Sequence, residues 1–208
     1  MKVIINEEQL RQIIESEGGE NLFYIPAHFL VSKLNAIVDN YKKKRDYDGL
    51  RVMGNLNLEK LPSDVVQKIL NELIEVDGYL YIRRMDIESL GNLTSVGGSL
   101  DLYGTPIKDL GKLKSVGGSL KLMDSKIESL GNLGYVGGNL DLSYSNVESL
   151  GKLIRVGGNL DLINVNVNSL GDLEYVGGNL YIADCPLSKL SDKEIKSQIE
   201  IKGEIYRD

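Results

Sequence analysis

Few side chains in this sequence have the chemistry of a catalytic centre. The 208 residues contain one histidine, His28, and one cysteine, Cys185. A general base or a nucleophile needs a partner group within hydrogen-bond reach, and neither residue has such a partner at a characteristic spacing. His28 lies in IPAHFL at the expected start of a helix, where a surface or capping role is the better-supported interpretation. We therefore predict that the protein is not an enzyme.

Cys185 occupies a position that recurs along the chain with changing residue types. The equivalent positions hold Met85, Thr105, Ser125, Ser145 and Val165. Such variety is typical of a packing site, so we predict a buried cysteine and not a nucleophile. A single cysteine also excludes an internal disulfide and fits a reducing compartment.

Metal and phosphate sites have recognisable sequence patterns, and none of them occurs here. One histidine and one cysteine cannot assemble a zinc site. The glycine pairs are not followed by the Gly-Lys-Ser/Thr of a phosphate-binding loop, and no D-x-[DN]-x-[DN]-G calcium loop occurs. We predict no metal and no cofactor.

Two aspartates could in principle act as a catalytic carboxylate pair. Asp141 and Asp161 are expected on adjacent strands, about 5 Å apart. Any two acids on a ladder of strands can come this close, so a solvated row of surface charges is the better-supported interpretation.

The charge balance argues against nucleic-acid and membrane partners. The formal net charge is −6, which disfavours binding to polyanions. The basic run KKKR at 42–45 is better interpreted as a solvated helix end that interacts with the helix dipole. The N-terminal stretch MKVIINEEQLRQII is interrupted by polar residues, so it predicts neither a secretory signal nor a membrane span. We expect a soluble, intracellular protein.

The dominant feature of the sequence is a repeat of twenty residues. A valine marks its phase at Val76, Val96, Val116, Val136, Val156 and Val176, followed by a glycine pair or its remnant. An apolar–x–apolar unit comes next, at Leu80/Ile82, Leu100/Leu102, Leu120/Leu122, Leu140/Leu142, Leu160/Leu162 and Leu180/Ile182. A degenerate earlier unit, VMGNLNL, lies at 52–58, and the insertion LPSDVVQKILNELIE separates it from the regular repeats. A fixed period of this length indicates a stacked solenoid.

The apolar–x–apolar alternation predicts one strand in each unit, because side chains at i and i+2 share a face. The predicted strands are at about 79–83, 99–103, 119–123, 139–143, 159–163 and 179–183. Stacking equivalent strands in parallel buries leucine against leucine in a continuous core. Glycines before each strand and after each closing leucine are expected at corners of the chain. Twenty residues leave no room for a full helix on the far side, so the solenoid should be narrow.

The ladder of L-x-L strands resembles a leucine-rich repeat protein. The form V-G-G-x-L-x-L, followed by x4-[IV]-x2-L-G-x-L, is also similar to receptor L-domains and to irregular bacterial and phage leucine-rich repeats. The resemblance covers about 50–205 and implies a scaffold for protein recognition. It departs from the common consensus in one respect, since no fixed asparagine follows the strand. An asparagine ladder at that turn is therefore not expected.

The predicted fold class is an α/β solenoid, a parallel-strand leucine-rich-repeat stack with a short helical N-terminal cap and a small C-terminal cap. We divide the chain into a helical cap at 1–50, a solenoid at 51–190 with regular repeats from about Val76, and a C-terminal cap at 191–208. Helices are expected from Asn6 to about Glu17, from Pro26 onward, and over Val65–Glu75. The stretch SDKEIKSQ predicts a helical turn, and IEIKGEIY a closing strand or hairpin.

With the leucines inside, the intervening residues of the strands should form an outward face. The residues that we predict to bind a partner there are Tyr81, Tyr103, Met123, Asp141, Asp161, Ile163 and Tyr181. Asp101 should add negative charge, and the row from Tyr79 and Ser99 to Asn179 should also be exposed. A second candidate surface is formed by Tyr135, Arg155 and Tyr175, because tyrosine and arginine are common at binding hot spots. The basic run at 42–45 is a third.

We therefore predict a non-enzymatic protein–protein interaction module whose partner carries a basic surface. The near-identical repeats are similar in style to accessory proteins of bacteriophages and their hosts. That resemblance implies a phage-encoded inhibitor of a host or defence protein, acting in the bacterial cytoplasm. The alternative is a structural or self-assembling, virion-associated protein, in which the same face would pair with itself as a homo-oligomer.

Overall fold

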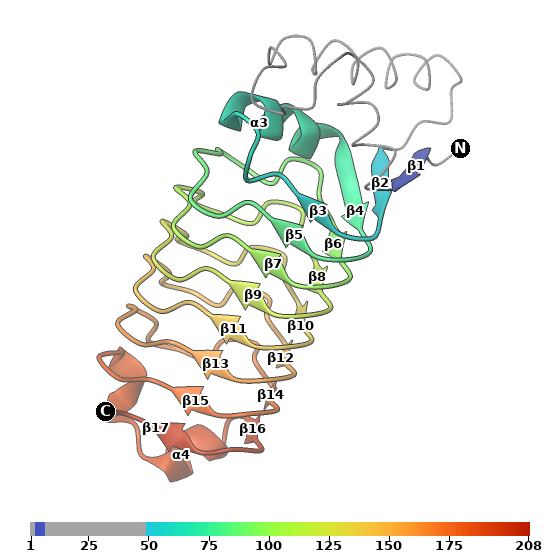
Figure 1. Ribbon diagram of the computed structural model, residues 1–208. Coiled ribbons are helices and arrows are strands. Elements are labelled where there is room, and N and C mark those ends of the chain that lie inside the picture. Colours follow the sequence, from blue (N-terminus) through green and yellow to red (C-terminus); the bar gives the residue numbers. More distant parts are fainter. Residues whose placement is uncertain (1–2, 7–48) are drawn as a thin grey trace.

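The computed structural model describes residues 3–6 and 49–208 and shows a parallel β-solenoid (Figure 1). One coil of the solenoid corresponds to one twenty-residue repeat, as the spacing predicts. The expected helices before residue 49, His28 and the basic run at 42–45 lie outside the described residues. Within the described residues no helix is long and apolar enough to cross a membrane.

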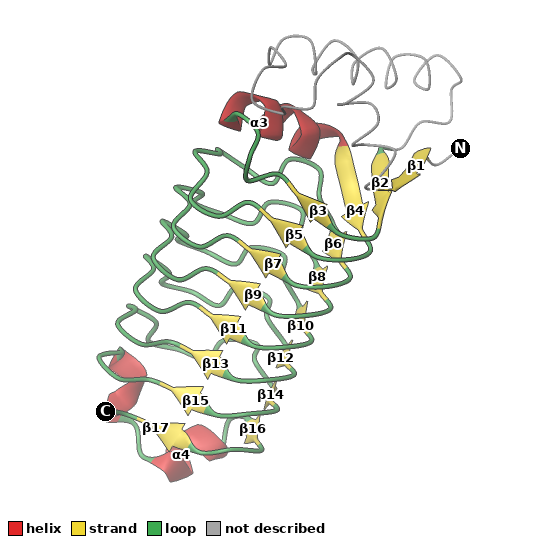
Figure 2. Cartoon of the chain, in the orientation of Figure 1, coloured by secondary structure: helices red, strands yellow, loops and turns green. Residues whose placement is uncertain are grey.

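The strands form two parallel sheets that run along the solenoid, while loops occupy the remaining side (Figure 2). The nine-stranded sheet contains β1 (Val3–Asn6), β2 (Leu50–Met53), β4 (Leu73–Val76), β6 (Ser95–Val96), β8 (Ser115–Val116), β10 (Tyr135–Val136), β12 (Arg155–Val156), β14 (Tyr175–Val176) and β16 (Glu200–Ile201). The eight-stranded sheet contains β3 (Leu56–Asn57), β5 (Leu80–Tyr81), β7 (Leu100–Asp101), β9 (Leu120–Lys121), β11 (Leu140–Asp141), β13 (Leu160–Asp161), β15 (Leu180–Tyr181) and β17 (Ile205–Tyr206).

The eight-stranded sheet is the one that the leucine alternation predicts. Its strands are shorter than the predicted five residues, but the backbone ladder continues beyond them. Between the first two regular coils, for example, the amides of Leu80, Ile82 and Arg84 donate to carbonyl oxygens of the next coil at 2.9, 3.2 and 2.7 Å. The extended segment therefore has about the predicted length.

The nine-stranded sheet was not predicted. Each of its regular strands ends at a repeat valine and contains only one inward residue, so no alternation is visible in the sequence. Its register pairs each valine with the valine of the next coil, as in Val136 with Val156. The sheet forms because the twenty-residue period brings identical short segments together, not because of local strand propensity.

The core consists of apolar rows that run through all coils. Leu100, Leu120, Leu140, Leu160 and Leu180 are fully buried, as are the repeat valines from Val116 to Val176. Side chains of this type contribute about 1.5–3 kcal/mol each when they are removed from water. Each coil is too thin to bury them alone, so the stability of one coil depends on its neighbours.

The glycine pairs lie at the corner between the two sheets, where adjacent coils approach closely. A Cβ on Gly157 would lie 2.1 Å from the carbonyl oxygen of Gly137, and the same short approach recurs at Gly117 and Gly177. These glycines are thus required by the contact between coils. The glycine after each closing leucine instead has a positive φ, 61° at Gly151, which confirms the second predicted corner.

A ladder of side-chain oxygens runs along the corner that precedes the eight-stranded sheet. Asn139 Oδ1 accepts a hydrogen bond from the Asn159 amide, and Asn159 Oδ1 accepts one from the Asn179 amide, both at 2.8 Å. Ser99 and Ser119 hydroxyl oxygens accept equivalent bonds at 2.9 and 3.0 Å. The row is exposed or partly exposed, as the outward alternation predicts, but its oxygen atoms also hold adjacent coils together, which the sequence does not reveal.

The turn after each strand depends on backbone conformation, in contrast to the side-chain hydrogen bonds between coils at the preceding corner. Its residue adopts a left-handed conformation, with φ between 53° and 65°, at Arg84, Gly104, Asp124, Tyr144, Asn164 and Asp184. Asparagine, aspartate and glycine tolerate this region better than arginine or tyrosine. No asparagine ladder forms here, in agreement with the sequence prediction.

The elements at the ends differ in detail from the predictions. Helix α3 spans Ser63–Glu72, and not Val65–Glu75, because the chain becomes extended at Leu73 to enter β4. Helix α4 (Asp192–Lys196) has a capping box between Ser191 and Glu194, and a 3₁₀ helix spans Pro186–Lys189. Beyond α4, β16 and β17 do not form a hairpin, since each extends one of the parallel sheets. The described chain is thus mostly sheet, and "β-solenoid" fits better than "α/β".

Candidate functional site

The outer surface of the eight-stranded sheet, which we call the ladder face, brings together the seven residues predicted to bind a partner. Its central row consists of Asn57, Tyr81, Asp101, Lys121, Asp141, Asp161, Tyr181 and Tyr206, in register on neighbouring strands. The row beside it consists of Arg83, Tyr103, Met123, Ser143, Ile163 and Ala183. The twenty-residue spacing does not reveal Tyr206, because the last coil is longer. The only signal for it is the alternation in IEIKGEIY.

Tyrosine pairs stand at both ends of the ladder face. Tyr79 and Tyr81 stack at the N-terminal end with ring centroids 6.0 Å apart. Tyr181 and Tyr206 stack at the C-terminal end with centroids 5.0 Å apart and planes 13° from parallel. Stacking restricts the rings in the free protein, so less rotamer freedom is lost when a partner covers them.

The predicted contact residue Tyr103 is covered by the protein's own arginines. The guanidinium carbon atoms of Arg83 and Arg84 lie 5.5 and 4.9 Å from its ring centroid. Arg84 also donates a hydrogen bond to the Tyr103 hydroxyl at 3.4 Å. Met123 and Ile163 in the same row are half-buried, and not fully exposed as the alternation predicts. This row therefore exposes little apolar area, and Arg83 and Arg84 place positive charge at its N-terminal end.

Asp101 does not provide the free negative charge that was expected of it. The residue is only 7% exposed. Its Oδ2 lies 3.6 Å from Arg83 Nε and 3.9 Å from Lys121 Nζ. The prediction for Asp101 is wrong because two flanking basic residues, one from each adjacent coil, neutralise the carboxylate.

Asp141 and Asp161 differ from Asp101 because neither has an ion-pair partner among the described residues, although Lys121, which pairs with Asp101, is the register neighbour of Asp141. They are direct partners in the strand register, about 5 Å apart at the usual strand spacing. Asp141 accepts hydrogen bonds from the amide and hydroxyl of Ser143 at 3.1 and 2.6 Å, and Asp161 accepts one from the Ile163 amide at 3.0 Å. In the part of the chain that the structure describes, no basic group lies within ion-pair distance of either carboxylate.

The environment of Asp161 disfavours its charged form. Burial raises the pKa of this carboxyl, the hydrogen bond from the Ile163 amide partly offsets the effect, and the Asp141 carboxylate raises the pKa further. A raised pKa in the folded chain means that protonation at low pH favours folding. This contribution is lost as the pH rises through the raised pKa. Near neutral pH, the like-charged pair therefore lowers the stability of the fold.

Asp161→Asn should consequently be a stabilising substitution at neutral pH. The amide keeps an oxygen for the Ile163 amide group but removes the buried charge and the repulsion from Asp141. We expect the free energy of unfolding to rise by up to about 1 kcal/mol at pH 7, and this gain to vanish below about pH 4. Urea unfolding followed by circular dichroism at both pH values measures the difference. A less stable variant at pH 7 would show that the pair is compensated.

A second cluster lies on the outer surface of the nine-stranded sheet. Tyr135, Arg155 and Tyr175 are in register on β10, β12 and β14, as the spacing predicts. Ile154, which the sequence did not single out, lies beside them and is 47% exposed. We call these four residues the Arg155 patch.

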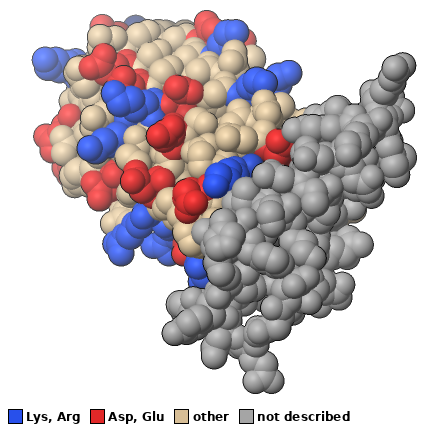
Figure 3. Space-filling model, turned by 90° about the horizontal axis from the view of Figure 1, so that it is seen from above, with Lys and Arg blue, Asp and Glu red and all other residues tan. Residues whose placement is uncertain are grey.

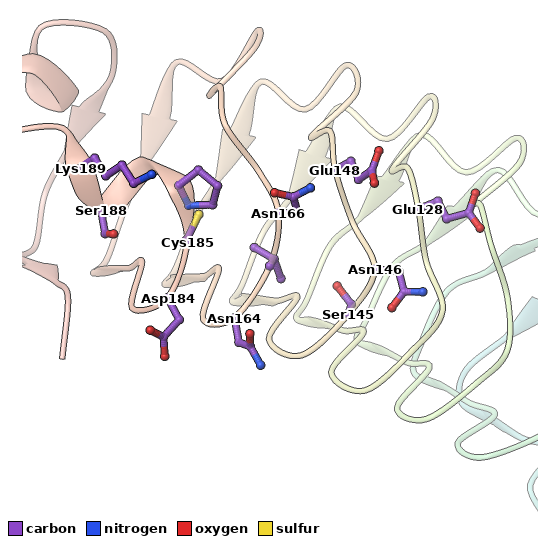
Figure 4. A pocket seen from close by; sticks show the side chains of 12 residues that line it. Glu128, Ser145, Asn146, Glu148, Asn164, Asn166, Asp184, Cys185, Ser188 and Lys189 are labelled. Carbon is purple, nitrogen blue, oxygen red and sulfur yellow. The ribbon is translucent and has the colours of Figure 1, made fainter.

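A groove of about 710 Å³ opens on the side of the coils that belongs to neither sheet. On this side, backbone hydrogen bonds also link successive coils, as from the Glu148 amide to the Glu128 carbonyl oxygen. No equivalent bond joins Asn168 to Glu148 among the described residues, and the groove lies where these bonds end. Figure 4 shows the side chain of Asp184 pointing away from the direction of Glu128 and Glu148. The carboxylates of Asp184, Glu128 and Glu148 therefore do not converge on one point.

Cys185 is buried, as its position in the repeat predicts. It is 3% exposed, and its Sγ donates to the Val167 carbonyl oxygen at 3.2 Å. Burial raises the pKa of the thiol, so the reactive thiolate is disfavoured. Residues 3–6 and 49–208 contain no group of three or more His, Cys, Asp or Glu side chains that could hold a metal ion.

Comparisons with known proteins find no match. No protein-family model, no curated protein and no solved structure matches this chain. The resemblance to leucine-rich repeats therefore stays a prediction, whereas the parallel solenoid with twenty-residue coils is an observed property of the structure.

Proposed function

We propose that the protein is a non-enzymatic interaction module of leucine-rich-repeat type, and that its ladder face binds a protein with a basic surface. The observation that carries this proposal is the in-register pair Asp141 and Asp161, neither of which has a basic group within ion-pair distance among the described residues. Lysine or arginine side chains of a partner would supply the missing charge.

The chain itself shows what compensates a carboxylate on this face. Asp101, in the same row, has Arg83 and Lys121 within 3.6 and 3.9 Å. Acidic and basic side chains are interspersed over the surface seen from above in Figure 3. The adjacent pair Asp141 and Asp161 differs from Asp101 in having no ion-pair partner among the described residues, and the repulsion within the pair lowers stability near neutral pH. Surface features that reduce stability are often retained for function.

The tyrosine pairs supply the apolar part of the proposed interface. Eight strands at a spacing of about 4.8 Å give the ladder face a length of roughly 34 Å. A stable complex covers about 800 Å² on each partner. A partner must therefore cover most of this face, from Tyr81 on the second strand to Tyr181 and Tyr206 at the C-terminal end, with the acidic pair between them.

In its most concrete form, we propose that the protein is a phage-encoded inhibitor that binds a bacterial host or defence protein. This identification rests only on the resemblance in style of the near-identical repeats to accessory proteins of phages and their hosts, since no curated protein matches the chain. The solenoid fits such a role, because outward residues can vary from coil to coil while the inward rows stay apolar.

The test is capture of partners from a bacterial lysate on the immobilised full-length protein, followed by binding measurements with the purified partner. Asp141→Asn combined with Asp161→Asn should weaken the complex about thirtyfold, since two interfacial charges at about 1 kcal/mol each amount to about 2 kcal/mol. Binding should also weaken as salt is raised from low to physiological concentration.

The matched control is Glu148→Gln combined with Asp172→Asn. It changes the net charge by the same amount at two exposed carboxylates outside both sheets. If the control weakens binding as much as the ladder variant, only the overall charge matters. If neither variant affects a partner that binds specifically, the ladder face is only a scaffold and the proposal fails.

A further inference from the structure

The Arg155 patch differs in chemistry from the ladder face. Its central guanidinium stacks on an aromatic ring, with Arg155 Cζ 3.7 Å from the Tyr175 ring centroid. Cation–π stacking of this kind holds the arginine in place without neutralising its charge. Within the described chain, no carboxylate lies within ion-pair distance of Arg155.

The patch is also unusually apolar for an outward sheet surface. Tyr135 is 42% exposed, Ile154 is 47% exposed and Tyr175 is half-buried. The adjacent row on the same surface consists of the glycines Gly137, Gly157 and Gly177, so backbone takes the place of side chains there. A Cβ on Gly137 would lie 3.1 Å from the Tyr135 hydroxyl, and one on Gly177 would lie 3.0 Å from the Tyr175 ring. Both rings therefore lie close to this glycine row.

A gap one side chain wide adjoins the patch at Gly134. The row that contains it reads Thr94, Lys114, Gly134, Ile154 and Glu174, linked from coil to coil by backbone hydrogen bonds. Gly134 thus places no side chain between those of Lys114 and Ile154 in this row. A Cβ added at Gly134 would have no atom nearer than 3.8 Å. The strands β8, β10 and β12 that carry this region are stacked in order in Figure 2.

We propose that the Arg155 patch is a second docking site, for an acidic, extended segment of a partner protein that also carries an aliphatic or aromatic side chain. Arg155 pairs with a carboxylate of that segment. Its apolar side chain occupies the gap at Gly134, against Tyr135 and Ile154. The occupant is identified by charge complementarity: Arg155 and Lys114, neither of which has an ion-pair partner among the described residues, border the gap, whereas Glu174 lies on the far side of Ile154.

This site is independent of the proposed function, since it lies on the other sheet and requires the opposite charge in its ligand. The patch is small compared with the roughly 800 Å² per partner of a standard interface. It therefore fits a short segment with an affinity in the micromolar range better than a globular surface.

The probe is a display library of random twelve-residue peptides, selected on the immobilised full-length protein. Sequences recovered in selection are then synthesised, and their dissociation constants are measured by fluorescence anisotropy. We expect a class of peptides rich in Asp and Glu with an aliphatic or aromatic residue. Arg155→Ala should weaken their binding at least fivefold.

The decisive comparison is Gly134→Glu against Gly134→Lys. Both variants fill the gap with a side chain of similar size, and the same row already accommodates Glu174 and Lys114, so both should fold. Gly134→Glu should weaken binding of the acidic peptides at least tenfold, and more than Gly134→Lys does. Asp141→Asn with Asp161→Asn should leave these peptides bound.

Three results would overturn this inference. The first is the absence of acidic sequences among the selected peptides. The second is equal binding to the two Gly134 variants. The third is concentration-dependent self-association, measured by analytical ultracentrifugation, that Arg155→Ala abolishes, because the patch would then be an interface between copies of this chain.

Discussion

Leu140→Asp is expected to abolish cooperative folding of the protein. Leu140 is fully buried and lies in register between Leu120 and Leu160 in the continuous apolar row. The substitution removes a buried leucine, which alone costs about 2–5 kcal/mol, and places a carboxylate where no partner is available. The combined cost is comparable with the whole stability of a typical domain, about 5–15 kcal/mol.

The position of Leu140 makes the effect long-range. A solenoid is stabilised by contacts between adjacent coils, so loss of a central coil deprives both neighbours of one packing surface. Circular dichroism and urea titration should show loss of the cooperative transition in Leu140→Asp. The control is Asn146→Asp, which introduces the same charge at an exposed position of the same coil and should unfold like the parent. A soluble Leu140→Asp variant with parental stability would contradict the shared core.

Gly157→Ala should destabilise the protein by several kcal/mol although it adds only one methyl group. The new Cβ would lie 2.1 Å from the Gly137 carbonyl oxygen, 2.9 Å from its carbonyl carbon and 3.4 Å from its Cα. Relief of this clash requires the two coils to separate, which disturbs backbone hydrogen bonds such as that from the Gly157 amide to Val136 at 2.8 Å. Forced overpacking typically costs about 1–3 kcal/mol, and a rigid backbone contact belongs at the upper end of that range or beyond.

Gly134→Ala is the matched control for this prediction. The substitution is chemically identical, but its nearest atoms are the Lys152 and Lys114 carbonyl oxygens at 3.8 and 3.9 Å, which is ordinary contact. It should leave the protein as stable as the parent or stabilise it by up to about 1 kcal/mol, because alanine restricts the unfolded chain. Thermal unfolding of the two variants side by side measures the difference. Equal effects would mean that the coils are not in close contact at the glycine pairs.

The part of the fold that could be predicted follows from periodicity. The sequence has an exact repeat of twenty residues with an L-x-L strand in each unit. The leucines of all units are buried together only if the units stack as parallel coils. The burial of Cys185 could be predicted for the same reason, since the repeat assigns it to an inward row. Local pattern is sufficient here because burial of a side chain depends on which way it points from the strand.

The second sheet and the contacts between coils could not be predicted in the same way. Two-residue strands such as β12 carry no alternation, and they form only when the equivalent segment of the next coil is beside them. Asn159 looks like any outward polar residue in the sequence, yet its Oδ1 holds the amide of Asn179 in the next coil. The end of α3 likewise depended on Leu73 joining a sheet whose other strands lie elsewhere in the chain.

For the candidate site, the sequence by itself determined which residues face outward and which rows they share. Only the tertiary structure decided which of their charges are free. Asp101 and Asp141 occupy equivalent repeat positions and both neighbour Lys121, but the lysine pairs with Asp101, which Arg83 also contacts, whereas Asp141 has no ion-pair partner among the described residues and lies beside Asp161. Pairing of this kind depends on the length and direction of side chains from three successive coils. A one-dimensional repeat pattern does not contain that information, because it specifies the period of the chain and not the distances between side chains.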